Sequence, residues 1–164
     1  LALTIGGTLA WLSTKDAPIT NTFNPSKVAC EVTESFDGKV KRNVNVKNTS
    51  DIPAFIRVKL VTYRTNDEGQ HIGGTASIPG FTLGTGWVKN GDYYYYIHPV
   101  EAGAFPAANL ADSITLTESY TGADGGHQSM DVMAEAIQSV PDDAVKAAWG
   151  FLIDEDGNLI VPGN

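Results

Sequence analysis

The sequence predicts an all-β protein, a jelly-roll-like sandwich of two sheets with one short helix near its C-terminus. Three observations carry this prediction: short apolar runs with period-two alternation, turn signals between them, and a composition with 17 glycines and only 18% charged residues. Short alternating runs bounded by Gly, Asn, Asp or Pro are typical of strands in sandwiches. The length of 164 residues is sufficient for one domain with its own core.

Two predicted strands, at residues 28–36 and 39–47, are joined by Asp37-Gly38, a dipeptide typical of tight hairpins. In the first, Val28, Cys30 and Val32 alternate on one face, so we expect Cys30 to be a small buried side chain. The second alternates throughout, as in a sheet with one face exposed to water. One face carries Val40, Val44 and Val46, and the other carries Lys39, Lys41, Asn43, Asn45 and Lys47.

The longest predicted strand is 54–65, with Ala54, Ile56, Val58 and Leu60 on one face and Phe55, Arg57, Lys59 and Val61 on the other. A short strand at 81–83 is expected next. Asn90-Gly91 then predicts a hairpin between strands at 87–88 and 92–98. The remaining strands are expected at 111–120, with Ile114 and Leu116 inward, at 128–140, with Met130, Val132, Ala134 and Ala136 on one face, and in a terminal hairpin of 151–153 and 159–161.

A single helix is predicted over 141–149. Pro141 precedes two acidic residues, Asp142 and Asp143, and Gly150 follows the last apolar position. Proline at the start, acids in the first turn and glycine after the end are the expected signals of a helix.

Composition and motifs exclude several classes of function. A net charge of -8 offers no basic stripe for nucleic acid. The single cysteine excludes an internal disulfide, and the three histidines form no zinc motif. The acidic run from Asp154 lacks the ligand spacing of a calcium loop and is better explained as a hairpin turn. Asn48-Thr-Ser fits a glycosylation sequon, a short pattern that arises by chance. We therefore predict a non-enzymatic protein without a cofactor.

A run of four tyrosines, Tyr93, Tyr94, Tyr95 and Tyr96, is a candidate aromatic surface patch for carbohydrate or protein. Alternation along a strand sends two of the rings inward and two outward. Half of the run is therefore expected in the core.

The first 12 residues are uncharged and mostly apolar, and the chain turns polar at Ser13. A bilayer span needs about 20 apolar residues, so this run is too short to cross a membrane. Small residues at Thr8 and Ala10 match the spacing that a signal peptidase accepts. We expect residues 1–11 to be the remnant of a secretory signal whose upstream part precedes this sequence, 12–27 an extended segment, and 28–164 the sandwich. The alternative is that the first residues form an ordinary buried strand or helix.

The stretch Gly6-Gly-Thr-Leu-Ala-Trp-Leu-Ser13, followed by Ile19-Thr-Asn-Thr-Phe23, resembles the start of proteins exported through a SipW-type signal peptidase. These are the TasA/camelysin-like surface and biofilm-matrix proteins of Gram-positive bacteria. Residues 46–58, Trp87 with 92–96, and 133–138 with 148–150 are similar to that group as well. The resemblance implies a secreted jelly-roll domain that polymerises into fibres, with the N-terminal segment of one subunit completing the sheet of the next. Camelysin-type members have been classed as metallopeptidases, but no zinc motif carries that activity to this chain.

We therefore expect a secreted fibre or matrix subunit at the cell surface. Its expected partner is a second copy of itself, and other matrix or cell-wall components are further candidate partners. The segment can be added to a free sheet edge, and the residues expected to anchor it are Trp11, Leu12, Ile19 and Phe23. The alternatives are that this segment folds onto its own sheet, or that the protein is a monomeric adhesion or carbohydrate-binding module. A secreted metallopeptidase is a third alternative.

Overall fold

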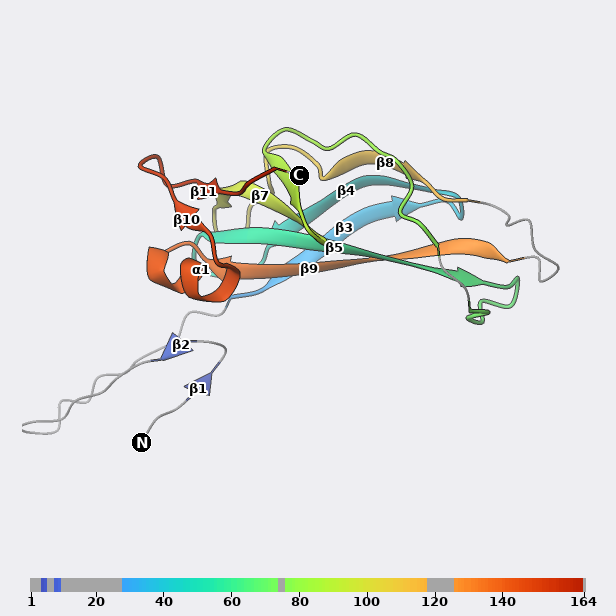
Figure 1. Ribbon diagram of the computed structural model, residues 1–164, viewed down its shortest axis with the longest axis horizontal. Helices are drawn as coiled ribbons and strands as arrows, with labels where there is room; N and C mark the ends of the chain where they lie inside the picture. The colour runs from blue at the N-terminus through green and yellow to red at the C-terminus, as the bar shows by residue number, and fades with distance from the viewer. Residues whose placement is uncertain (1–3, 6–7, 10–27, 74–75, 118–125, 164) are drawn as a thin grey trace, which may run out of the picture.

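The computed structural model describes residues 4–5, 8–9, 28–73, 76–117 and 126–163, and its main body is a sandwich of two antiparallel sheets (Figure 1). The first sheet has the order β3-β4-β8, and the second has the order β6-β7-β5-β9. Their strands are β3 (Cys30–Phe36), β4 (Val40–Asn48), β5 (Ala54–Thr65), β6 (Trp87–Asn90), β7 (Tyr93–Val100), β8 (Ala111–Thr115) and β9 (His127–Gln138). The predicted all-β sandwich is confirmed.

Five smaller elements complete the described chain. Helix α1 (Asp142–Trp149) precedes the antiparallel pair β10 (Leu152–Ile153) and β11 (Leu159–Ile160), and a second pair, β1 (Thr4–Ile5) and β2 (Thr8–Leu9), lies near the N-terminus. The helix ends at Gly150, which has a φ of 78° and donates its backbone N–H to the Lys146 carbonyl. The predicted helix and terminal hairpin are confirmed. No helix in the described ranges is long and apolar enough to cross a bilayer.

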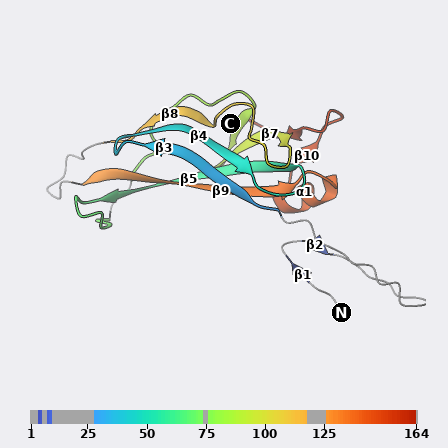
Figure 2. The ribbon, with the colours of Figure 1, turned by 180° about the vertical axis from the view of Figure 1, so that it is seen from behind.

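The edge strands of the two sheets lie side by side along one side of the sandwich and are separated by another segment along the other side. On one side β3 lies beside β9, as the rear view shows (Figure 2). On the other side the edge strands are β8 and β6, and the segment from 76 to 86 runs between them. We call the interval between β8 and β6 the seam.

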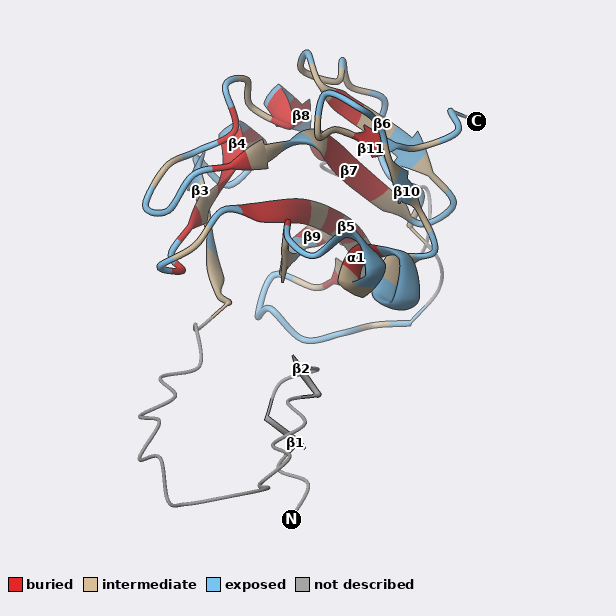
Figure 3. Ribbon diagram, turned by 90° about the vertical axis from the view of Figure 1, so that its left-hand side faces the viewer, coloured by how far each residue is buried: buried red, intermediate tan, exposed pale blue. Residues whose placement is uncertain are grey.

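The main core fills the space between the sheets and follows from the alternation of β5. Ile56, Val58 and Leu60 are at most 4% exposed and pack with Val44 and Val46 of β4. Viewed end-on, the buried stretches of β4, β5 and β7 line this interior (Figure 3). One face of β9, with Met130, Val132, Ala134 and Ala136, packs against the same core as predicted.

A second cluster lies on the outer face of the four-stranded sheet. Phe55 points away from the main core and is buried against Val145 of α1 and Leu159 of β11. The helix and the terminal hairpin therefore cover one end of this face. Side chains partly buried around this centre are Ile97, Ile137, Trp149, Phe151, Ile153 and Val161.

The predicted alternation of β4 is wrong over its first half, and Asn45, which was also expected on the wet face, is buried and donates to the Pro106 carbonyl. Lys41 was expected on the wet face, but it pairs with fully buried Ile114, is 6% exposed and forms an ion pair with Glu34. Val40 pairs instead with Thr115, whose side chain is exposed. The cause is Asn43, which has a φ of 52° where the β3–β4 register shifts. Such a bulge reverses the face of every residue before it.

The predicted strand at 81–83 is also absent as a paired element. This segment is extended, but it forms no ladder with any described strand.

The expected remnant 1–11, apart from β1 and β2, and the expected extended segment 12–27 lie outside the described residues.

Candidate functional site

The run of four tyrosines lies on β7 and is mostly interior. Tyr94 and Tyr96 belong to the main core, and Tyr95 on the opposite face is 5% exposed. The Tyr95 ring has edge contacts with Trp149 and Phe151, at centroid distances of 5.7 and 4.9 Å. The alternation was predicted correctly, but the expected outward pair of rings is not an open patch because the C-terminal elements cover Tyr95. Burial raises the pKa of the Tyr94 hydroxyl above its usual value.

Tyr93 is half-buried, and a cation lies over its ring. The guanidinium carbon of Arg57 is 4.0 Å from the ring centroid, and Lys59 Nζ is 5.6 Å from it. Arg57 also donates from Nε to Glu135 at 2.7 Å and lies 4.9 Å from the Trp149 ring centroid. This arrangement ties β5, β7, β9 and α1 together, and it makes Tyr93 a poor platform for stacking a sugar.

The expected anchor residues of the donor segment, Trp11, Leu12, Ile19 and Phe23, lie outside the described residues. The described residues do include an unpaired sheet edge, which lies along the seam.

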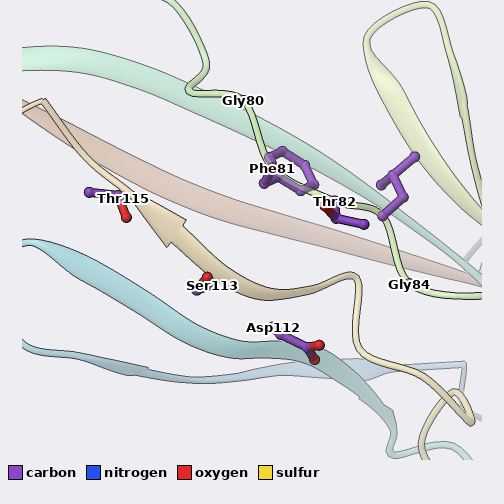
Figure 4. A pocket seen from close by; sticks show the side chains of 8 residues that line it. Gly80, Phe81, Thr82, Gly84, Asp112, Ser113 and Thr115 are labelled. Carbon is purple, nitrogen blue, oxygen red and sulfur yellow. The ribbon is translucent and has the colours of Figure 1, made fainter.

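A segment spanning residues 77–84, which we call the strap, runs along the seam opposite β8 (Figure 4). Within the described part of the chain, β8 forms a ladder with β4 only, so its other edge is unpaired. Leu116 donates its N–H to the Lys39 carbonyl of the β4 side. Because backbone groups alternate along an antiparallel strand, Ser113 and Thr115 direct theirs into the seam.

One end of the strap is held by close backbone contact. Gly84 donates its N–H to the Leu110 carbonyl at 3.1 Å, and Trp87 Nε1 donates to the Ala108 carbonyl at 2.9 Å. A Cβ at position 84 would lie 1.9 Å from the Asn109 carbonyl oxygen, so only glycine fits here without a shift.

At the other end, Thr62 Oγ1 of β5 donates to the Ala76 carbonyl next to the strap, and a second side chain, that of Gln128 on β9, bonds the strap itself. Its Nε2 donates to the Ser77 carbonyl at 2.6 Å, and its Oε1 accepts the Thr117 N–H at 2.9 Å. Gln128 is 3% exposed, and its own N–H donates to the Thr117 carbonyl. One buried amide thus connects the strap to the chain just beyond β8.

Between these two ends, a hollow lies on each side of the strap. The hollow toward β8 has a volume of about 500 Å³ and is lined by the strap together with Asp112, Ser113 and Thr115. The hollow toward β6 has a volume of about 310 Å³ and includes Ile78, Phe81, Lys89 and Tyr94 in its lining. The seam is therefore a slot beside an unpaired strand edge, closed at both ends and incompletely filled along its length.

Other residues singled out in the sequence have structural partners. His71 stacks on Tyr63 with 4.2 Å between ring centroids, His127 bonds Thr65 Oγ1 at 3.1 Å, and His98 bonds Asn158 at 2.7 Å. Among the residues that the structure describes, no group of three His, Cys, Asp or Glu side chains could hold a metal ion.

The acidic turn and the sequon are also explained by local structure. Asp154 accepts the N–H groups of Asp156 and Asn158, and these bonds lower the pKa of its carboxyl group. The turn therefore closes the hairpin of β10 and β11, as predicted. Asn48 is fully buried and its amide donates to the Val100 carbonyl, so the sequon is inaccessible in the folded chain.

Cys30 is half-buried against the main core, and burial, with a smaller effect of Glu135, raises the pKa of its thiol. A raised thiol pKa disfavours the reactive thiolate, in agreement with the predicted structural role.

Comparison of the chain with protein-family models, with curated proteins and with solved structures found no match.

Proposed function

We propose that this protein is a secreted structural subunit of a cell-surface or biofilm-matrix fibre, which assembles head-to-tail by donating residues 12–27 of one copy to the seam of the next. The observation that carries the proposal is the unpaired edge of β8 beside a slot of about 500 Å³. Free N–H and C=O groups on a sheet edge favour pairing with another extended chain. The main chain then supplies affinity, and alternate side chains supply specificity.

The proposed donor precedes the sandwich in the sequence and has apolar residues at wide spacing. Ile19 and Phe23 have the same parity and would share one face of an extended strand. A contact between a donor on one copy and an acceptor on the next is heterologous and does not close, so it produces filaments. A donated segment of this length fits the permanent class of interface, which buries about 2,000 Å² or more.

Electron microscopy of the concentrated full chain tests the proposal directly. We expect filaments from the full chain and a soluble, folded monomer after deletion of residues 11–23. A monomeric adhesion module would form no filaments in either case. Filaments that persist unchanged after the deletion would show that a different segment makes the contact.

A pair of variants on β8 tests the acceptor. Ser113→Pro removes a backbone N–H that faces the seam while leaving the bonds to β4 intact, because an outward edge position tolerates proline. Ser113→Ala is the matched control that keeps the backbone donor. We expect Ser113→Pro to fold and fail to polymerise, and Ser113→Ala to polymerise as the unaltered chain does. Equal polymerisation of both variants would show that β8 is not the acceptor strand.

A further inference from the structure

The strap already places side chains where those of an added strand would go. Phe81 and Leu83 pack against the main core, and the Phe81 ring lies 5.6 Å from that of Tyr94. Thr82 between them is exposed. The strap therefore has the alternation of a strand, with two side chains turned inward.

The strap nevertheless lacks the backbone bonds of a strand. No described backbone hydrogen bond joins residues 78–83 to β8 or to β6, and a hollow lies on each side. The hydrogen bonds of the strap lie at its two ends, at Gly84 and at Gln128, and the core contacts of Phe81 and Leu83 hold its middle. A segment held in this way can leave the seam at a lower cost than a laddered strand, because few hydrogen bonds have to be broken.

We propose that the strap is a resident occupant of the seam, which blocks assembly in the monomer and moves out when the strand of a second copy enters. This inference rests on the proposed function. An incoming strand would pair with the β8 edge and direct alternate side chains into the same interior as Phe81 and Leu83. Both cannot fill that interior at once, so entry of one requires departure of the other.

Gln128 bonds the end of the strap nearest Thr117, beside the bond from Thr62 to Ala76, and loss of the Gln128 bond is expected to loosen that end. Gln128→Glu is close to isosteric and keeps an acceptor for the Thr117 N–H, but its carboxylate cannot donate to the Ser77 carbonyl. Gln138→Glu is the matched control, because Gln138 is at the opposite end of β9 and has no described side-chain hydrogen bond. Both variants add the same negative charge.

The first experiment is hydrogen exchange on the full-length monomers, read by mass spectrometry. We expect the Gly84 amide, whose hydrogen bond to the Leu110 carbonyl joins the strap to the chain before β8, to exchange about tenfold faster in Gln128→Glu, since the strap opens more often. Amides of β5 should be unchanged, and Gln138→Glu should match the unaltered chain. Unchanged exchange of the strap in Gln128→Glu would contradict the role of Gln128.

The second experiment follows seeded polymerisation by light scattering. We expect Gln128→Glu to shorten the lag several-fold and Gln138→Glu to leave it unaltered. Faster strap exchange with an unaltered lag would overturn the inference while leaving the fibre proposal intact. Absence of polymer from every protein, including the unaltered chain, would contradict the proposed function itself and the inference with it.

A third measurement needs no variant. In the unaltered chain, the Gly84 amide is expected to lose protection in the fibre relative to the monomer, while the seam-facing amides of Ser113 and Thr115 gain it. A strap that is equally or better protected in the fibre would show that it stays in place, and the inference would then be wrong.

Discussion

Gly84 lies against Asn109 so closely that a Cβ at position 84 would be 1.9 Å from the Asn109 carbonyl oxygen. This contact joins the end of the strap to the segment that leads into β8. It fixes the closed end of the seam, and it explains why a glycine is required there without any unusual φ.

Substitution of this glycine is therefore expected to be costly. Gly84→Ala should lower the free energy of unfolding by about 2–4 kcal/mol, because backbone atoms rather than a flexible side chain have to move. Gly80→Ala is the control, since a Cβ there would meet nothing within 4 Å. Urea denaturation should show a change of at most about 0.5 kcal/mol for Gly80→Ala. Equal effects of the two substitutions would contradict the close approach.

The buried amide of Asn48 is predicted to be one of the largest single polar contributions to stability. Its Nδ2 donates to the carbonyls of Ile52 and Val100, at 2.9 and 2.8 Å, and its Oδ1 accepts the Ser50 N–H at 3.0 Å. Asn48→Ala leaves these buried groups without partners and should cost about 2–4 kcal/mol.

The control for this prediction is Asn90→Ala, which removes one exposed bond to the Pro162 carbonyl. It should cost less than about 1 kcal/mol in the same denaturation experiment. A loss of similar size in the two variants would mean that the network around Asn48 contributes little.

Features of this fold that depend on neighbouring residues could be predicted from the sequence. The hairpins at Asp37-Gly38 and Asn90-Gly91, the alternation of β5 and the helix ending at Gly150 all follow from local turn chemistry and periodicity. The bulge at Asn43 could not be predicted from the alternation of polar and apolar residues in β4. Asparagine can adopt a positive φ, and no distinctive flanking sequence marks the positions where it does.

Features that depend on distant segments could not be predicted in the same way. Tyr95 is buried by residues more than fifty positions later in the chain, at Trp149 and Phe151. The seam depends on which strands become sheet edges, and on a bond from Gln128 to Ser77. The apolar alternation of Phe81 and Leu83 correctly predicted that these side chains point inward. It wrongly predicted that the segment pairs with a neighbouring strand.

The cation between two aromatic rings should stabilise the contact between the sheet and α1. Arg57 lies 4.0 Å from the Tyr93 centroid and 4.9 Å from that of Trp149. A double-mutant cycle with Arg57→Met and Trp149→Leu is expected to give a coupling energy of about 0.5–1.5 kcal/mol. The matched cycle of Lys59→Met with Trp149→Leu should give a smaller value. A coupling near zero for the Arg57 pair would mean that the two side chains act independently.

Two turn carboxylates are expected to make the protein sensitive to acid. Backbone N–H groups of Val40 and Lys39 lower the pKa of Asp37 below its usual value, and those of Asn158 and Asp156 do the same for the pKa of Asp154. A pKa that is lower in the folded state gives stability that is fully present above the unfolded value and is lost as the pH falls through the folded value. Thermal denaturation should therefore show a falling Tm below about pH 4.

The contribution of one turn can be separated with a variant that keeps the acceptor. Asp154→Asn retains an oxygen for the Asp156 and Asn158 N–H groups but cannot be protonated in this range, so the fall in Tm below the unfolded pKa should become shallower. Asp156→Asn is the control, because its carboxylate makes no described hydrogen bond. An acid dependence that is the same in Asp154→Asn and in the unaltered chain would show that the bonds of this turn do not favour the ionised carboxylate, and the loss of stability at low pH would then have to arise at Asp37 or elsewhere.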